Sequence, residues 1–149
     1  MQWMIYGANG YTGRLMAKEA VARGMRPILA GRRREELEAL AGELGGLEVR
    51  VFGLEASALD LGLRGVSIVL HCAGPFSETC APMLEACLRA KAHYLDITGE
   101  IDVFAHCHQH DAQAKAAGIV VLPGAGFDVV PTDCLSAMLK RDLPDATSL

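Results

Sequence analysis

The feature that most constrains the fold of this chain is a glycine-rich turn close to its N-terminus. The short apolar run Met4-Ile5-Tyr6 is followed at once by Gly7-Ala8-Asn9-Gly10-Tyr11-Thr12-Gly13 and then by a segment with helical spacing. A strand, a glycine-rich turn and a helix in that order are typical of a cradle for a dinucleotide. The sequence therefore predicts that residues 7–13 bind the phosphates of such a ligand.

Each glycine of this turn has an expected role. We expect Gly7 to adopt the unusual backbone angles of a tight turn, Gly10 to let a pyrophosphate approach the backbone, and Gly13 to let the helix pack closely on the strand. The helix N-terminus offers free N–H groups and a partial positive charge to the phosphates. The alternative is an ordinary strand-to-helix turn that binds no ligand, since the spacing G-x-x-G-x-x-G is one residue longer than the G-x-G-x-x-G form.

Downstream of this turn, strands and helices alternate over nearly the whole chain. Apolar runs predict strands at residues 4–6, 27–30, 47–52, 66–72, 93–97 and 119–122. Helical spacing and stop signals predict helices at residues 12–23, along the apolar stripe 37–44, within 56–64, at 82–92, at 101–117, and from a cap at Thr132 or Asp133 onward. In the first helix, Leu15, Met16 and Ala20 are expected to face inward.

This alternation predicts an α/β fold, a Rossmann-like doubly wound parallel sheet with the strand order 3-2-1-4-5-6. Ligands of such sheets bind beyond the carboxyl ends of the strands, where the order switches between the first and fourth strands. The switch places Gly7 to Gly13 opposite Cys72-Ala73-Gly74-Pro75-Phe76, which follow the fourth predicted strand. Two separate turns are therefore expected to meet at one crevice.

Composition narrows the classes of protein to which the chain can belong. Its 149 residues suit one domain, and a hydrophobic fraction of 51% is that of a globular protein. A formal net charge of -4 argues against a general nucleic-acid binder. We also see no membrane span and no secretion signal, and the five cysteines lack a C-x-x-C pair, so we expect reduced thiols in a cytoplasmic protein.

The residues after the second predicted strand indicate which dinucleotide is bound. A site for NAD(H) usually places an acidic residue there, but this strand ends in Ala30-Gly31-Arg32-Arg33-Arg34. Guanidinium groups match the charge and geometry of a 2′-phosphate, so the sequence predicts NADP(H) rather than NAD(H). Arg32 and Arg33 are the expected contacts and Arg34 is expected to face solvent; the alternative is a row of exposed arginines at a helix start.

Several motifs of the chain resemble those of a known family. It is similar to the NADP-binding domain of the saccharopine dehydrogenase-like oxidoreductases, which include saccharopine reductases and trans-acting enoyl reductases. The resemblance rests on motifs spread in order along the chain: residues 6–13, Ala30-Gly31-Arg32, Ala73-Gly74-Pro75-Phe76, residues 94–100 and residues 126–133.

The resemblance implies roles for these motifs. Residues 7–13 would hold the pyrophosphate, Arg32 the adenosine end, and residues 73–76 the nicotinamide side. Thr98-Gly99-Glu100 and Gly126-Phe127-Asp128 would lie near the reactive end of the cofactor. The chain departs from the family at Gly53-Leu54-Glu55, where many relatives carry an acidic residue at the strand tip, and in its length, since relatives usually continue into a substrate domain.

Other residues that could form a metal or catalytic site have weaker support from the sequence. His106, His108 and His110 resemble a metal cluster, but zinc-site spacing to a second ligand group is lacking, so no metal is predicted. No tyrosine is followed by lysine four residues later, which removes the Tyr-x-x-x-Lys mechanism. Cys72 is either a reactive thiol or small packing beside the cofactor. Glu100 and Asp128 are either acid–base groups or turn formers, so the catalytic residues remain unknown.

These observations lead to a functional expectation. The chain is expected to be the NADP(H)-binding domain of an oxidoreductase that positions nicotinamide for hydride transfer to a C=N, C=O or C=C substrate. A small-molecule substrate would be held by a second domain, and the isolated chain would show little or no turnover. A homodimer is a further possibility. The alternatives are a non-catalytic module that senses NADP(H) and a Rossmann-like fold with an empty cleft.

Overall fold

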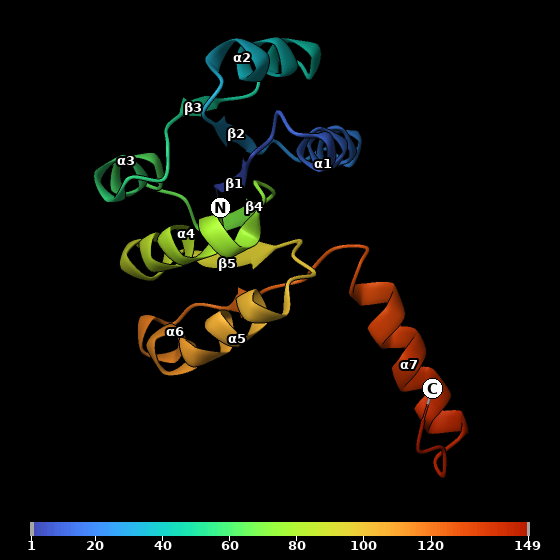
Figure 1. The fold of residues 1–149 in the computed structure, drawn as a ribbon. Helices are drawn as coiled ribbons and strands as arrows, with labels where there is room; N and C mark the ends of the chain where they lie inside the picture. Colours follow the sequence, from blue (N-terminus) through green and yellow to red (C-terminus); the bar gives the residue numbers. More distant parts are fainter. Residues whose placement is uncertain (1, 149) are drawn as a thin grey trace.

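A parallel sheet of six strands organises the molecule, in the order β3-β2-β1-β4-β5-β6 (Figure 1). The computed structural model describes residues 2–148. The strands are β1 (Trp3–Tyr6), β2 (Ile28–Gly31), β3 (Val49–Val51), β4 (Ile68–His71), β5 (His93–Asp96) and β6 (Val121–Leu122). The helices are α1 (Tyr11–Ala22), α2 (Arg34–Glu43), α3 (Ala56–Gly62), α4 (Phe76–Ala90), α5 (Ile101–Gln109), α6 (Asp111–Ala117) and α7 (Val130–Asp142). The predicted fold class and strand order are confirmed.

The register of the three central strands sets the position of the loops that follow them. Tyr6, the last residue of β1, pairs with Ala30 of β2 on one side and with His71 of β4 on the other. The chain therefore leaves all three strands at nearly the same level. Their following turns emerge next to one another at the carboxyl edge of the sheet, as the doubly wound order requires.

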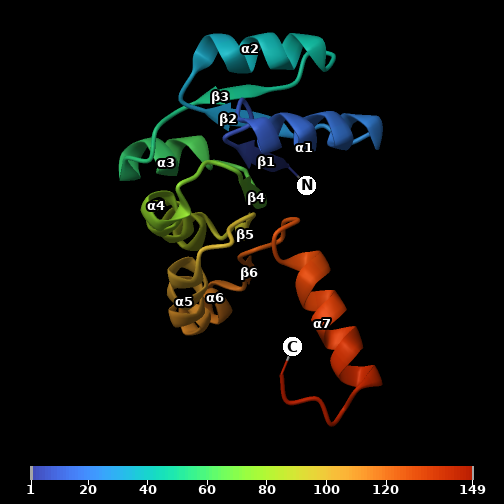
Figure 2. The ribbon, with the colours of Figure 1, turned by 45° about the vertical axis from the view of Figure 1, so that its right-hand side comes forward.

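Helices cover the sheet from both sides (Figures 1 and 2). Ile5 and Leu29 point to the face packed by α1 and α2, where Leu37 and Leu40 complete an aliphatic cluster. The opposite face packs against α3, α4 and α5 through a larger cluster; its members include Met4, Tyr6, Val69, Leu59, Met83, Leu84, Tyr94 and Val103. Alternating side chains of each strand thus enter two separate halves of the core.

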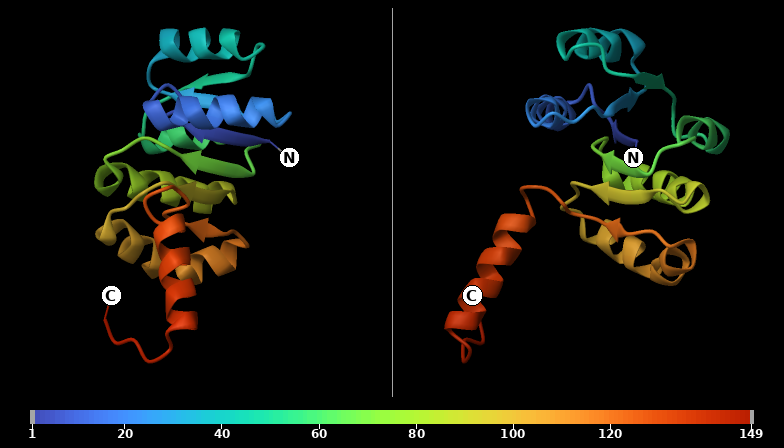
Figure 3. Two further views of the ribbon diagram at one scale, coloured as in Figure 1. Left: turned by 90° about the vertical axis from the view of Figure 1, so that its right-hand side faces the viewer. Right: turned by 180° about the vertical axis from the view of Figure 1, so that it is seen from behind.

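Helix α7 stands apart from this layered body and projects away from the sheet in every view (Figure 3). Each of its 13 residues is exposed or half-buried. Among the helices of residues 2–148, none is both long and apolar enough to cross a membrane. The predicted start of this helix is wrong, because α7 begins at Val130 and the Thr132 hydroxyl donates back to the carbonyls of Asp128 and Val129 instead of capping the helix.

The largest error in the predicted elements is the start of α4. We expected a helix from residue 82, whereas α4 begins at Phe76 and carries Pro82 in its interior. The carboxylate of Glu100 explains the earlier start, since it accepts hydrogen bonds from the backbone nitrogens of Phe76 and Ser77. These bonds satisfy two of the N–H groups that a helix start leaves free, and this contact lies far away in the sequence.

Two smaller expectations are also wrong. The predicted helix 101–117 is divided at His110 into α5 and α6, where the His110 side chain bonds the carbonyl of His106 and the His110 nitrogen donates to Cys107. In α1, Leu15 is 51% exposed. The buried face of α1 is instead formed by Gly13, Ala17 and Ala20, because the helix lies so close to the sheet that small residues are needed there.

Candidate functional site

A hollow of about 310 Å³ opens at the carboxyl ends of β1, β2 and β4. It lies at the predicted switch point between the first and fourth strands. Its walls come from the two turns that follow β1 and β4 and from the tip of β2. The lining residues are Tyr6, Gly7, Asn9, Gly10, Gly31, Arg32, Arg33, Cys72, Ala73 and Gly74.

Gly7 is the point at which the two turns touch. Its φ is +80°, a conformation that residues with a Cβ rarely adopt. A Cβ placed on Gly7 would lie 2.9 Å from both the nitrogen and the Cβ of Ala73. The nitrogens of Gly7 and Ala8 donate to the carbonyl of Ala30, at 2.8 and 3.1 Å, which fixes the turn to the end of β2. The absent side chain is therefore what allows this crevice to form.

The start of α1 lies next to the hollow, since its N-cap residue Gly10 is part of the lining. A Cβ on Gly13 would lie 2.8 Å from the Cα of Ala8, so only glycine lets the helix approach the turn this closely. Gly10 caps the helix with its carbonyl, which accepts from the nitrogen of Arg14 at 2.9 Å. The first turn carries no carboxylate, and its N–H groups lack intrahelical partners, so the positive end of the helix dipole faces the opening.

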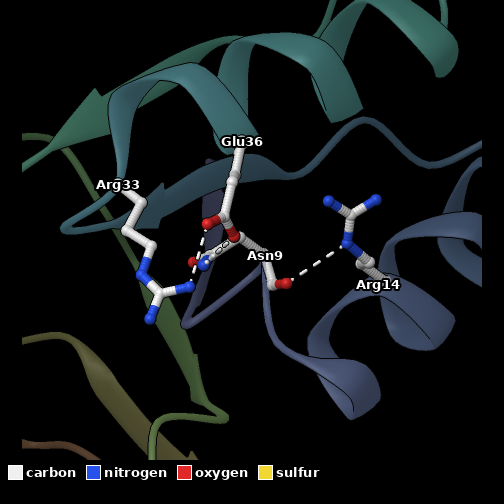
Figure 4. A network of polar contacts seen from close by, with 4 residues as sticks. All are labelled: Asn9, Arg14, Arg33 and Glu36. Atoms are coloured by element: carbon white, nitrogen blue, oxygen red, sulfur yellow. Dashed lines mark hydrogen bonds and ion pairs between the residues drawn. The ribbon is translucent and has the colours of Figure 1, made fainter.

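The arginines after β2 form the side of the hollow that faces α2. Arg32 and Arg33 line it, whereas Arg34 turns away and pairs with Glu38 at 3.0 Å. Figure 4 shows that the carboxylate of Glu36 lies between Asn9 and Arg33, accepting a 2.9 Å hydrogen bond from each. These bonds, that from Asn9 first, lower the pKa of Glu36 below its ordinary value.

The turn after β4 supplies the opposite wall. Cys72, Ala73 and Gly74 line the hollow, while Pro75 and Phe76 belong to the start of α4 and lie outside it. The Phe76 ring instead packs edge-on against His71, with ring centroids 5.4 Å apart. Burial, with a smaller effect of the nearby Asp96, raises the pKa of the Cys72 thiol to about 12. A thiol this weakly acidic is a poor nucleophile, so its surroundings favour packing over reactivity for Cys72.

Glu100 lies beside this wall and holds it in place. Its two carboxylate oxygens accept from the nitrogens of Phe76 and Ser77, both at 2.8 Å. These backbone hydrogen bonds, that of Phe76 first, lower the pKa of Glu100. A carboxylate that is stabilised in its charged form is a weak general acid, so the geometry favours a positioning role.

Asp96 joins the end of β5 to the segment that precedes the Gly126-Phe127-Asp128 motif. It is fully buried and accepts hydrogen bonds from the Tyr94 hydroxyl at 2.7 Å, the Thr98 nitrogen at 3.0 Å and the Gly124 nitrogen at 2.8 Å. A Cβ on Gly99 would lie 3.8 Å from the Cβ of Asp128. The structure thus brings the two downstream motifs of the sequence together.

Not every predicted contact residue faces the hollow. Ala8 is buried in the core, Gly13 packs against the turn, and Tyr11, the first residue of α1, is 84% exposed. Thr12 is half-buried in the first turn and does not line the hollow. Their side chains therefore play no part in its walls, although the backbone of residues 11–13 forms the helix N-terminus.

Three residues of the site were missed from the sequence. Tyr6 and Gly31 line the hollow, and Tyr6 donates its hydroxyl to the carbonyl of Phe52 at 3.2 Å. Glu36 contacts two lining residues. Tyr6 and Gly31 stand in motifs of the sequence but had been given no role, and for Glu36 the available signal was its three-residue spacing from Arg33, which on a helix places opposite charges side by side.

Possible metal ligands lie elsewhere. The ring centroids of His106 in α5 and His110, the residue that follows α5, are 4.5 Å apart, and the side chain of His108 is exposed. A second group consists of Cys80, Asp96 and Cys107, whose ligand atoms lie within 4.8 Å of one another. The Asp96 carboxylate already accepts three hydrogen bonds, so this group is explained as part of the core.

A larger hollow, of about 690 Å³, lies between α5, α6 and β6. Its walls include Phe104, Ile119, Val121 and Pro123, and it has no glycine-rich turn. This larger hollow lies at the edge of the sheet, far from the switch point. The smaller hollow, at the switch point, is therefore the one whose position and lining suit a dinucleotide.

Comparison with known proteins agrees with this geometry. Residues 3–122 match the family described as the saccharopine dehydrogenase NADP binding domain. The chain is 30% identical to the trans-acting enoyl reductase of Mycobacterium leprae and 28% identical to the human saccharopine dehydrogenase-like oxidoreductase. Each alignment covers 97% of this chain, but only 37% and 38% of the respective relative.

A solved structure shows the same fold. The apo saccharopine dehydrogenase (L-Glu forming) of Saccharomyces cerevisiae superposes with a TM-score of 0.82 at 17% identity, over 97% of this chain and 32% of the yeast enzyme. The description of this family names NADP, so the expected cofactor is supported, and the glycine turn and arginines of this chain fit it. The chain belongs to the saccharopine dehydrogenase NADP-binding domain family.

Proposed function

We propose that the hollow at the switch point is where this chain holds NADP(H). The pyrophosphate would lie against the backbone of residues 7–13, the 2′-phosphate beside Arg32 and Arg33, and the nicotinamide toward Cys72-Ala73-Gly74-Pro75-Phe76. The observation that carries this proposal is the contact of Gly7 with Ala73, which joins the two turns into one crevice with both arginines in its wall.

We further propose that the domain serves hydride transfer. Nicotinamide supplies or accepts the hydride when bound, and the protein holds and orients the ring. The substrate would carry a C=N, C=O or C=C bond and would contact a second domain, because this chain spans under two fifths of the relatives it matches. The names of those relatives favour an enzyme over a module that only senses the cofactor.

The binding proposal is tested by titrating NADPH into the chain and following the heat or the nicotinamide fluorescence. Replacing Arg32 or Arg33 with Ala should weaken NADPH binding about tenfold, since each substitution removes a charge-assisted contact at an exposed site. Arg34→Ala is the matched control, because Arg34 pairs with Glu38 outside the hollow. Equal effects of the three substitutions, or the absence of binding, would refute the assignment.

The proposal on activity has a separate test. Residues 1–149 should bind NADPH but reduce imines and enones little or not at all, since the substrate-holding part is expected in a second domain. Robust turnover by this chain would contradict that division of labour. The five free thiols suit a reducing compartment, and we propose a cytoplasmic location.

A further inference from the structure

The side chain of Glu36 occupies a particular place beside the proposed cofactor site. Its Oε1 accepts from Nη1 of Arg33 and its Oε2 accepts from Nδ2 of Asn9, both at 2.9 Å (Figure 4). Asn9 belongs to the glycine-rich turn and Arg33 precedes α2, so one carboxylate connects the two parts of the wall. Arg14 contacts this network from the other side, donating to the Asn9 carbonyl at 3.2 Å.

The three arginines after β2 differ in their partners. Arg33 pairs with Glu36 and Arg34 pairs with Glu38, whereas Arg32 forms no ion pair within residues 2–148. A phosphate that reaches Arg33 must therefore compete with a carboxylate already bound there. A phosphate that reaches Arg32 meets no such competitor.

We propose that Glu36 is a specificity-determining residue that reduces the preference of this site for NADP(H) over NAD(H), by competing with the 2′-phosphate for Arg33. This inference rests on the proposed function. A 2′-phosphate carries about -1.5 to -2 charges near neutral pH. When it takes Arg33, the Glu36 carboxylate loses its cation and lies near a second anion. NAD(H) has a hydroxyl instead, so it can bind with the Arg33–Glu36 pair intact.

The second contact of Glu36 decides which substitution tests this idea. Removing the whole side chain would also release Asn9 and disturb the glycine-rich turn. In Glu36→Gln the amide oxygen can still accept from Asn9, while the negative charge is lost. The variant thus separates the charge of residue 36 from its support of the turn.

The experiment measures the dissociation constants of NADPH and NADH for the wild-type chain and Glu36→Gln at low and at high salt. We expect NADPH to bind about fivefold more tightly to the variant at low salt, which is the scale of one exposed ion pair. NADH binding should change by less than about twofold, and salt should reduce the NADPH gain by screening. Thermal unfolding of the variant checks that the fold is kept.

Glu38→Gln is the matched control. Glu38 lies on the same helix and pairs with an adjacent arginine, but that pair is outside the hollow, so the same change in net charge should leave the NADPH-to-NADH ratio unchanged. In an Arg33→Ala background, the gain from Glu36→Gln should shrink. A gain of the same size there would show that Glu36 does not act through Arg33.

The results separate the inference from the proposed function. If wild-type chain binds NADPH and Glu36→Gln weakens NADPH, or changes both nucleotides equally, Glu36 only supports the structure and the inference is wrong. If the wild-type chain does not bind NADPH, or Arg32→Ala leaves binding intact, the proposed function itself fails.

Discussion

Gly7 and Ala73 meet so closely that a Cβ on Gly7 would lie 2.9 Å from the Ala73 nitrogen. Gly7→Ala should therefore destabilise the chain by more than about 2 kcal/mol, because it combines a positive φ with a clash between the new methyl group and Ala73. NADPH binding should fall with it, since the crevice can admit the side chain only by widening. Urea unfolding and NADPH titration measure the two effects.

Gly24→Ala provides the comparison for this substitution. Gly24 has a φ of +76°, but an added Cβ would meet no atom of the described structure within 4 Å. Its cost should be that of the backbone conformation alone, about 1 kcal/mol, without an effect on NADPH. Equal costs at the two glycines would show that the contact with Ala73 is not what requires Gly7.

Replacing two helical glycines with alanine should change the free energy of unfolding in opposite directions. Gly13→Ala should destabilise the chain by about 2 kcal/mol or more, because the new methyl group would press on the backbone of Ala8 at 2.8 Å. Gly42→Ala in α2 adds its methyl group in open space, so it should stabilise the chain by about 0.5–1 kcal/mol. Thermal melting of both variants shows whether the changes differ in sign.

The buried side chain of His71 should make the chain less stable in acid. Its ring is fully buried beside Tyr6, Phe76 and Tyr94, and burial lowers its pKa to about 3. The pKa of a histidine in the unfolded chain is about 6.5. Below that pH the unfolded chain therefore binds a proton at His71 that the folded chain does not bind. The free energy of unfolding should thus fall from about pH 6.5 toward pH 3, by at most about 1.4 kcal/mol per pH unit.

His71→Gln isolates this contribution. The amide does not titrate and can still reach the Thr79 hydroxyl, which lies 2.9 Å from His71 Nε2. Urea unfolding between about pH 7.5 and pH 5 should show a shallower loss of stability in the variant than in the wild-type chain. Parallel curves would mean that another group causes the acid sensitivity.

The Glu100 carboxylate should also make stability depend on pH, but through loss of a negative charge in acid. Its carboxylate binds the first N–H groups of α4, and these bonds lower its pKa in the folded chain. The stabilisation should be fully present above the unfolded pKa, about 4.3, and should be lost as pH falls through the lower folded pKa. Glu100→Gln should therefore be less stable than the wild-type chain at neutral pH, with the difference narrowing in acid.

The matched control for Glu100 is Glu85→Gln, a substitution at an exposed position of α4 itself. It should leave the free energy of unfolding nearly unchanged across the same pH range. A difference between Glu100→Gln and the wild-type chain that does not depend on pH would contradict a role for the charged carboxylate.

The sequence predicted the fold well because the signals for it are local. Apolar runs separated by glycines produced the six strands in the right order, and the turn from Gly7 to Gly13 indicated the edge of the sheet where the hollow lies. The largest error arose where a residue distant in sequence decides the structure. The start of α4 depends on Glu100, which follows Phe76 by 24 residues.

The site was predicted less completely for a related reason. The motif suggested that residues 7–13 act together, but only Gly7, Asn9 and Gly10 line the hollow. Whether a side chain of a helical turn points inward depends on how the helix docks, and that is set by the small residues Ala17 and Ala20. Glu36 lies in α2 and bonds Asn9 of the glycine-rich turn, and the spacing along one helix carries no information about a contact with another element.

Much of the wall of the hollow is built from main chain, at Gly7, Gly10, Gly31 and Gly74. Peptide groups are common to all twenty amino acids, so mutation can rewrite most neighbouring side chains without altering that surface. At Gly7 the surface requires that no Cβ be present, because one would lie 2.9 Å from Ala73. The fold itself is shared with the yeast enzyme at 17% identity.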